Sequence, residues 1–434
     1  MATNVQKGGM KKMQHSTSDR ISHLPRNVTE KILMSLPLRD AVRTSALSSK
    51  WRNAWVTLPQ LVFDDAFYRK LRRRRKNNFM MTIYQVMLLH RGPIVKFELS
   101  VPVLESRPEI DQLILFLSNN GLQELVLHIK QGKQPYRLPS YTFSCLQLEH
   151  LELNFCLFSP PLGFRGFSIL LTLELSDVAI TSEVFSSLVS GCPLLERLKV
   201  SNHKTSFSWL EIAAPNLKSL CFAGQFGFIC LKNAYKLARV SISFYEWMPR
   251  ETYGGGEICN WVTFFASLPA VEFLELDYGC LKFFSAGGVL DRLPTDPSHL
   301  KILKLYIESV DAFSSILCLL RSSPNLEKFV IGVPIHADED EETLVKLSEV
   351  ERCSDMSLNK LREVELQEAW GRRFGLLFIK LLLAKSPVLE KMVVPADNLF
   401  GRDRMKFMQL VTQFKRCSPH AEVYSEVPDA DRGY

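Results

Sequence analysis

The sequence lacks a long uninterrupted hydrophobic run. Its longest apolar stretch, Gly375–Ala384, is broken by Lys380. That stretch is far shorter than the roughly 18 apolar residues that a membrane-spanning helix needs. The N-terminal residues also lack the apolar core of a secretory signal. We therefore expect neither a membrane segment nor secretion.

The ten cysteines lack paired spacing. They include no CxxC pair and no Cys/His pattern suited to zinc. In a chain without a secretory signal, scattered cysteines are typical of reduced thiols rather than of a disulfide framework. This pattern favours the nucleus or the cytoplasm as location.

Motifs of the common enzyme classes are missing as well. The sequence has no GxxxxGK[ST] loop, no GxGxxG after a strand, no HExxH and no GxSxG, which are the motifs of phosphate, dinucleotide, zinc and serine chemistry. We predict no catalytic residue, no metal site and no cofactor. Gly254–Gly256 could cradle an anion and Asp338–Glu342 could hold a cation, but we interpret both as solvated loops.

Positive charge is concentrated at one end of the 434 residues. The formal net charge is +7, yet residues 1–76 hold 17 Lys and Arg against 5 Asp and Glu, and the remainder holds 36 against 41. Seven of the eight residues in Arg69–Lys76 are basic. Clustered cations attract polyanions or direct nuclear import. Without interleaved aromatic residues or a nucleic-acid-binding motif, we favour a solvated linker.

Residues 19–60 contain three short helical patterns in a segment punctuated by Pro25, Pro37 and Pro59. In the first, Val28, Ile32 and Leu36 recur at helical spacing, and the third carries Trp51 and Trp55 on one face. Three short helices of this kind carry more apolar surface than so small a segment can bury. The segment is therefore expected to dock on a partner or on the rest of the chain.

One segment resembles the F-box, a short helical module: LPRNVTEKILMSLPLRDAVRTSALSSKWRNAW. The resemblance rests on Leu24-Pro25, Leu36-Pro37-Leu38 and Trp51-Arg52. It implies that the chain binds a Skp-family adaptor and, through it, a cullin. The adaptor-binding residues that it implies are Leu24, Pro25, Ile32, Leu33, Leu36, Pro37, Leu38, Val42, Leu47, Trp51 and Trp55.

Beyond residue 90 one spacing recurs, apolar-x-x-apolar-x-apolar, which is typical of a leucine-rich-repeat strand and its lead-in. Helix-length apolar stretches such as Phe313–Leu320 lie upstream of several copies, so we predict the order strand, loop, helix, loop. One such unit cannot bury its apolar face alone, and stacked units would form a solenoid. The twelve copies begin at Ile94, Leu122, Leu148, Leu170, Leu195, Leu217, Leu237, Val271, Leu300, Leu326, Leu361 and Leu389.

The segment from Leu358 onward is similar to the FBD region that ends many plant F-box/leucine-rich-repeat proteins. The predicted fold class is α/β, a short N-terminal three-helix F-box followed by an irregular leucine-rich-repeat solenoid. The predicted segments are a disordered lead-in (1–18), the F-box (19–60), a basic linker and helix (61–90), the leucine-rich-repeat solenoid (91–350), FBD-like C-terminal repeats (351–425) and a tail (426–434).

Strand positions between the buried apolar residues are expected to face outward and to select the protein that binds. Among them, Phe273, Ile302, Tyr306 and Val330 would form an apolar patch of hot-spot size, the predicted target-binding residues. The long insertion before Val271 could instead fold over this patch. A register slip of one residue would exchange the buried and outward sets.

These features predict a non-catalytic substrate-recognition subunit of a Skp-cullin-F-box ubiquitin ligase. The F-box would bind the adaptor, and the solenoid would bind an unknown target protein. Two alternatives remain open: a non-degradative interaction scaffold, and a nucleic-acid-binding protein that uses Arg69–Lys76. The sequence identifies neither the target nor any small co-ligand.

Overall fold

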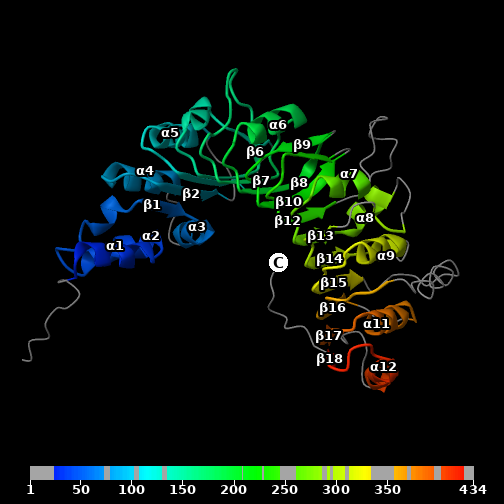
Figure 1. Ribbon diagram of the computed structural model, residues 1–434. Coiled ribbons are helices and arrows are strands. Elements are labelled where there is room, and N and C mark those ends of the chain that lie inside the picture. Colours follow the sequence, from blue (N-terminus) through cyan, green and yellow to red (C-terminus); the bar gives the residue numbers. More distant parts are fainter. Residues whose placement is uncertain are drawn as a thin grey trace, which may run out of the picture. The chain divides into compact units, whose positions relative to one another are not determined.

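The chain divides into two compact units, residues 1–99 (unit 1) and 100–434 (unit 2). Figure 1 labels their helices and strands in chain order. The computed structural model describes residues 24–72, 79–101, 107–129, 134–207, 209–226, 229–244, 261–285, 291–293, 297–307, 312–333, 356–368, 373–394 and 402–424.

Unit 1 opens with short helices joined by turns. Helix α1 starts directly after Pro25 and α2 directly after Pro37. Proline is tolerated at a helix start because its missing N–H removes no hydrogen bond from the helix interior. The predicted third helix is absent, because residues 48–53 form turns that lead into a 3₁₀ helix. The elements are α1 (Arg26–Met34), α2 (Leu38–Arg43), η1 (Thr44–Ala46), η2 (Ala54–Thr57), β1 (Gln60–Phe63), α3 (Asp65–Arg72), α4 (Phe79–Leu89) and β2 (Lys96–Val101).

Aromatic side chains fill the core beneath these helices. Trp51 and Trp55 are almost fully buried and pack with Leu33, Ala41 and Leu58. Burying a tryptophan removes a large apolar area from water, so two of them stabilise a small segment strongly. Strand β1 follows this core in the chain and pairs in parallel with β2.

Unit 2 is built on one parallel sheet whose strands lie in sequence order. Each strand pairs in parallel with the next one along the chain, as β5 does with β7 and β14 with β15. The strands are β3 (Glu124–Ile129), β5 (His150–Asn154), β7 (Thr172–Ser176), β8 (Arg197–Phe207), β10 (Ser219–Phe226), β12 (Arg239–Ser243), β13 (Phe273–Leu276), β14 (Ile302–Tyr306), β15 (Lys328–Val333), β16 (Glu363–Glu368), β17 (Lys391–Val393) and β18 (Glu422–Tyr424).

All twelve predicted repeat starts lie two residues before a strand, from Ile94 ahead of β2 to Leu389 ahead of β17. Each of these side chains is at most 2% exposed. The apolar lead-in therefore anchors every turn into the core before the strand begins, as a stacked solenoid requires. The predicted repeats are confirmed.

A second layer covers one face of the sheet of unit 2, and Figure 1 shows its helices on that side. We call the opposite face of the sheet the open face. The prediction of a helix in every repeat is only partly confirmed. This layer also contains two short parallel strand pairs, β4 with β6 and β9 with β11. The layer contains α5 (Arg107–Ser118), β4 (Tyr136–Arg137), η3 (Ser140–Ser144), β6 (Cys156–Leu157), α6 (Ser182–Ser190), β9 (Leu210–Ala213), β11 (Ile229–Lys232), α7 (Trp261–Ala266), α8 (Tyr278–Ser285), α9 (Phe313–Arg321), α11 (Arg373–Lys385) and α12 (Arg402–Gln413).

Cysteines of the described residues are unpaired, and most are enclosed in the core. Only Cys417 among them is exposed, and Cys221 and Cys230 are half-buried. Across the described ranges, no helix has the length and apolar character needed to cross a membrane. Several predicted segments lie outside the described residues: the lead-in 1–18, the basic residues 73–76, the glycine-rich tip 254–256, the acidic run 338–342 and the tail 426–434.

Candidate functional site

The outer side of α1 in unit 1 carries apolar side chains. Val28 and Ile32 are 36% and 37% exposed, whereas Thr29 and Leu33 on the inner side are buried. An apolar stripe at i and i+4 normally faces the core of its own domain. Here part of the predicted stripe points away from the core and is accessible to another molecule.

The predicted adaptor-binding residues fall into two groups. Leu33, Leu38, Trp51 and Trp55 are buried and form the core of the segment. The accessible ones lie around that core. They are the exposed Pro25, Ile32, Pro37 and Leu47 and the half-buried Leu24, Leu36 and Val42.

A pocket of about 280 Å³ opens between the α1–α2 connection and the segment around β1 and α3. Its walls are mainly apolar, which suits an inserted hydrophobic side chain. The apolar side chains around it include Leu33, Leu36, Leu38, Leu58, Val62 and Phe67.

The open face of unit 2 is arranged in rows, because equivalent positions of neighbouring strands pair directly. In β5 and β7, for example, Glu152 lies opposite Glu174, and the flanking leucines are buried. The predicted alternation of buried and outward positions holds for most of these strands, but Thr172, Phe273 and Val330, which lie at predicted outward positions, are themselves buried. The central row is Glu152, Glu174, Lys199, Cys221, Ser241, Glu275, Lys304, Val330 and Glu365.

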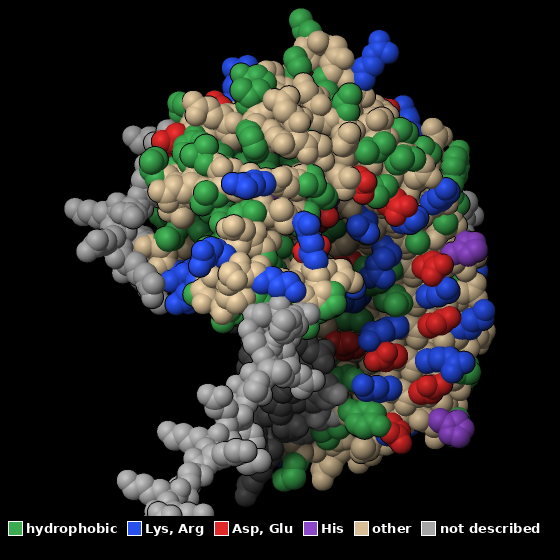
Figure 2. Space-filling model, turned by 90° about the vertical axis from the view of Figure 1, so that its left-hand side faces the viewer, with side chains coloured by type: hydrophobic (Ala, Val, Ile, Leu, Met, Phe, Trp, Pro, Cys, Tyr) green, Lys and Arg blue, Asp and Glu red, His purple; other side chains and the backbone are tan. Residues whose placement is uncertain are grey.

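Side chains of both charge signs occur along these rows. Figure 2 shows basic and acidic side chains arranged side by side on one flank of the molecule. Lys328 Nζ lies 3.1 Å from Glu363 and 3.4 Å from Glu365 on the neighbouring strand. Such exposed pairs each contribute about 0–1 kcal/mol. They make the open face polar and give it a pattern that a partner can complement.

The four predicted target-binding residues differ in accessibility. Val330 is 1% and Phe273 9% exposed, whereas Ile302 is half-buried and Tyr306 is 37% exposed. The ring of Phe273 lies 4.2 Å from the guanidinium carbon of Arg239, within cation–π range. Tyr306 therefore offers most of the apolar area in this group.

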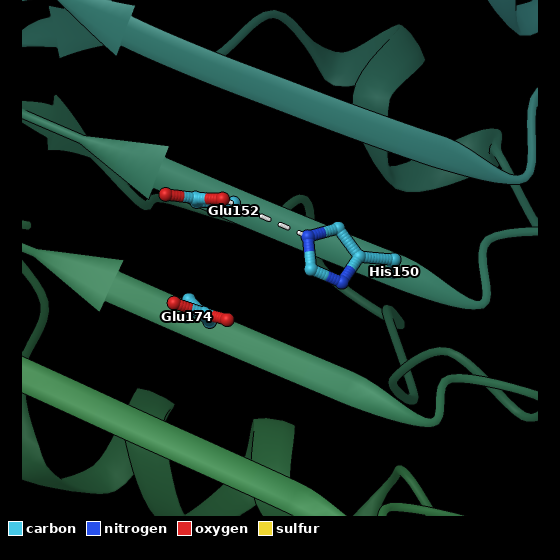
Figure 3. A group of neighbouring side chains, drawn as sticks. All are labelled: His150, Glu152 and Glu174. Atoms are coloured by element: carbon cyan, nitrogen blue, oxygen red, sulfur yellow. Dashed lines mark ion pairs between the residues drawn. The ribbon is translucent and has the colours of Figure 1, made fainter. Parts of the chain in front are cut away.

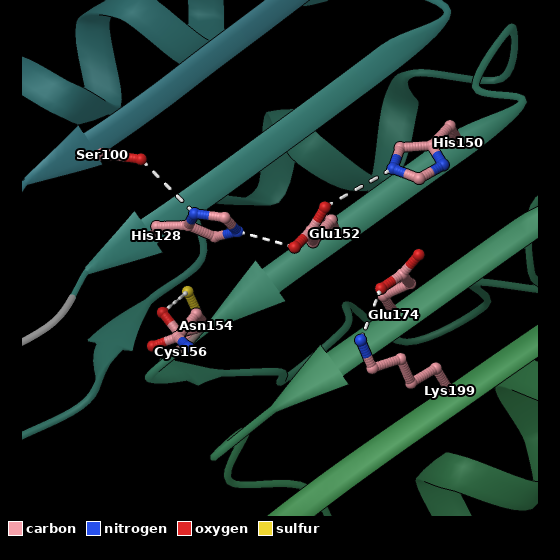
Figure 4. Close-up of polar contacts among 8 residues, drawn as sticks. All are labelled: Ser100, His128, His150, Glu152, Asn154, Cys156, Glu174 and Lys199. Carbon is pink, nitrogen blue, oxygen red and sulfur yellow. Dashed lines mark hydrogen bonds and ion pairs between the residues drawn. The ribbon is translucent and has the colours of Figure 1, made fainter. Parts of the chain in front are cut away.

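A histidine–carboxylate cluster lies at the other end of the open face. His128 Nε2 donates to Glu152 Oε1 at 2.7 Å, since an ionised carboxylate only accepts. His150 Nε2 lies 3.7 Å from the second oxygen of Glu152. The hydrogen bond from His128 and the neighbouring imidazole of His150 hold the pKa of Glu152 well below its usual range. Figure 4 shows these side chains projecting from adjacent strands.

Ser100, His128 and Glu152 resemble a hydrolase triad only superficially. Ser100 Oγ lies 3.3 Å from His128 Nδ1, on the side of the ring away from Glu152. The residue is 4% exposed, so its hydroxyl has no open approach for a substrate. A nucleophile needs that access as well as its base.

His150, Glu152 and Glu174 were not predicted as a site from the sequence. One ligand atom from each lies within 4.8 Å of the others. Figure 3 shows the three side chains on the two neighbouring strands. His150 and Glu152 are two residues apart on one strand, which puts them on the same face. Glu174 joins them through the pairing of β5 with β7. The repeat starts Leu148 and Leu170 place Glu152 and Glu174 at the same position of neighbouring units, but this spacing does not indicate that their side chains could share a ligand.

Comparison with known protein families identifies both parts of the chain. Residues 21–62 match the F-box domain model. Residues 110–331 match the model described as FBD-associated F-box protein At5g56370, LRR repeats. The first match includes the helices with the exposed apolar stripe, and the second extends from α5 to β15.

Similar full-length relatives come from Arabidopsis thaliana. The F-box/FBD/LRR-repeat protein At1g13570 is 40% identical over 412 residues, which is 93% of this chain and 98% of the relative. The putative F-box/FBD/LRR-repeat protein At4g13965 is 27% identical, over 71% of this chain and 74% of its own length. With the two family matches and the parallel repeat sheet, this similarity shows that the chain belongs to the F-box/FBD/LRR-repeat family.

Proposed function

We propose that this chain is the non-catalytic substrate-recognition subunit of a Skp-cullin-F-box ubiquitin ligase. The observation that carries the proposal is the exposed apolar stripe of α1 on a segment that matches the F-box. Water-exposed Ile32 and Leu47 cost little in the folded chain but gain hydrophobic stabilisation when a partner covers them.

The adaptor is proposed to bind the accessible residues Pro25, Ile32, Pro37 and Leu47, with Leu24, Leu36 and Val42 at the margin. Leu33, Leu38, Trp51 and Trp55 hold these residues in place from beneath, since all four are buried. The pocket between the α1–α2 connection and β1 is open to one apolar side chain of the adaptor. Through the adaptor the chain joins a cullin.

Co-purification tests this proposal. The chain is co-expressed with a Skp-family adaptor, alongside a variant that carries Leu24→Ala, Pro25→Ala and Ile32→Ala. We expect the wild type to retain the adaptor and the variant to lose it. Leu162→Ala, which alters a fully exposed leucine in unit 2, is the matched control and should bind normally. If the folded wild type does not bind, the ligase assignment fails.

The target protein is proposed to bind the open face at Tyr306 and Ile302, with the buried side chains of Phe273 and Val330 supporting this surface rather than contacting the target. Holding the target next to the conjugating machinery raises the local concentration of its lysines, so the receptor needs no catalytic group. This role belongs to the nucleus or the cytoplasm.

Proteins that co-purify with the wild type when the proteasome is inhibited, but not with Tyr306→Ala, would identify the target. Tyr235, 68% exposed, supplies the control Tyr235→Ala, which should retain the same proteins. A target that accumulates under inhibition supports degradation, whereas a bound protein of constant abundance supports a scaffold instead.

A further inference from the structure

We propose that His150, Glu152 and Glu174 form a binding site for a divalent transition cation, with Zn²⁺ as its simplest occupant, on the open face of unit 2. The site does not depend on adaptor binding. It would add a ligand to the protein-binding surface that the repeats present.

Ligand chemistry suits such an ion. An imidazole nitrogen and two carboxylate oxygens are donors that zinc accepts, usually as three protein ligands with one further position for water or another group. Strands β5 and β7 supply all three through a fixed parallel pairing, so the donors lie on a rigid part of the scaffold.

Distances within the cluster fit a shared metal better than a direct hydrogen bond. His150 Nε2 and Glu152 Oε2 are 3.7 Å apart, which is beyond hydrogen-bond range. Two ligands of one tetrahedral zinc ion, each about 2.0–2.1 Å from the metal, lie about 3.4 Å from each other. All three donor atoms lie within 4.8 Å of one another, so small side-chain rotations bring them to that spacing.

A neighbouring histidine orients one of the proposed ligands. His128 Nε2 bonds Oε1 of Glu152, and Oε2 of that carboxylate is directed to the His150 side (Figure 4). Metal-bound carboxylates are commonly fixed by a hydrogen bond of this kind. The His128 contact therefore prepares Glu152 to bind a cation through its second oxygen.

Access and charge also fit. The side chains of His150, Glu152 and Glu174 are 26%, 29% and 27% exposed, so an ion can enter from solvent and keep one coordination position open. Two carboxylates balance the dication. The ammonium of Lys199 lies 3.5 Å from Glu174. Its positive charge would therefore compete with the metal ion for that carboxylate.

Titration of the untagged full-length chain with Zn²⁺ tests the site, and Co²⁺ serves as the spectroscopic probe. We expect one saturable site for Zn²⁺ and a tetrahedral d–d spectrum with Co²⁺, without the sulfur charge-transfer band that a cysteine site would give. His150→Ala and Glu174→Gln should each weaken binding by at least tenfold. Melting curves recorded without metal show whether these variants are folded.

Two further variants complete the test. Lys199→Gln should tighten Zn²⁺ binding by roughly tenfold, because a cation next to the dication is removed. Glu275→Gln, in the same row but on β13, is the matched control and should leave the affinity unchanged. The proposal is overturned if no saturable binding occurs, if the Co²⁺ spectrum shows thiolate ligation, or if His150→Ala and Glu174→Gln bind like the wild type.

Discussion

Ile32 and Leu33 are adjacent in α1 and have opposite surroundings. Leu33 is fully buried against the tryptophans, and Ile32 is exposed. The sequence shows two similar aliphatic residues in a helical pattern and cannot tell which one faces the core, because both apolar stripes are plausible for so short a helix. In the structure, Leu33 stabilises the core, whereas Ile32 is accessible to a partner.

Leu33→Ala should lower the free energy of unfolding by about 2–5 kcal/mol, because it leaves a cavity in the core. Ile32→Ala at an exposed position should change it by about 0.5 kcal/mol. Urea unfolding followed by tryptophan fluorescence measures both. Equal losses of stability would show that the two residues are not on opposite sides of the helix.

Buried cysteines should resist alkylation. Burial raises the pKa of Cys145 to about 11, of Cys156 to about 12 and of Cys192 to about 11, and the thiolate is the reactive form. At pH 8 we expect iodoacetamide to modify exposed Cys417 first and to leave these three intact until the chain unfolds. Mass spectrometry of the peptides reports each site. Early modification of Cys156 would contradict its enclosure in the core.

At the scale of elements, spacing along the chain predicts the sheet well. The apolar-x-x-apolar-x-apolar pattern places a buried lead-in two residues before every strand of the large sheet from β2 to β17, because each repeat must bury the same positions against its neighbours. Strand β1 obeys the same spacing through Leu58, Leu61 and Phe63. This strand overlaps residues 61–90, which were expected from the sequence to form a basic linker and helix.

Other elements could not be predicted from spacing. The third helix of the F-box segment is replaced by turns and η2, since the packing of Trp51 and Trp55 overrides a short helical pattern. Strands β9 and β11 lie in the layer where helices were expected. Their partners lie in a different repeat, so neither sequence segment reveals the pairing by itself. The repeat spacing does align β5 with β7, but it gives no sign that His150, Glu152 and Glu174 bring their ligand atoms together.

Gly166 is required by a close approach of two loops. Its φ is +96°, and a Cβ there would lie 2.3 Å from the carbonyl oxygen of Gly191. Gly163 has a φ of +89° with nothing within 4 Å. Gly163→Ala should lower the free energy of unfolding by about 1–2 kcal/mol through backbone strain alone. Gly166→Ala should lower it by several kcal/mol more, because the backbone must also move.

Thermal or urea unfolding of the two glycine variants measures these losses in the free energy of unfolding directly. The pair is matched, since both positions have a left-handed φ and lie three residues apart. If Gly166→Ala is no more destabilised than Gly163→Ala, the loop that carries Phe164 and Phe167 does not pack against Gly191 as described.

At the scale of the whole molecule, the chain combines two surfaces with different chemistry. Unit 1 exposes apolar side chains around a small aromatic core, and unit 2 presents a polar open face with paired charges. Family membership accounts for the architecture of both, but function belongs to the exposed residues rather than to the fold. The identity of the proposed target therefore depends on the side chains of the open face rather than on the fold.

The most direct test of the proposed role is hydrogen exchange of the full chain with and without a Skp-family adaptor. We expect slower exchange of backbone amides within residues 26–47 when the adaptor binds, because the partner covers the exposed stripe of α1. Exchange in β14, Ile302–Tyr306, should remain unchanged. Binding that leaves residues 26–47 unprotected, or no binding by the folded chain, would contradict the assignment of this segment as the adaptor-binding site.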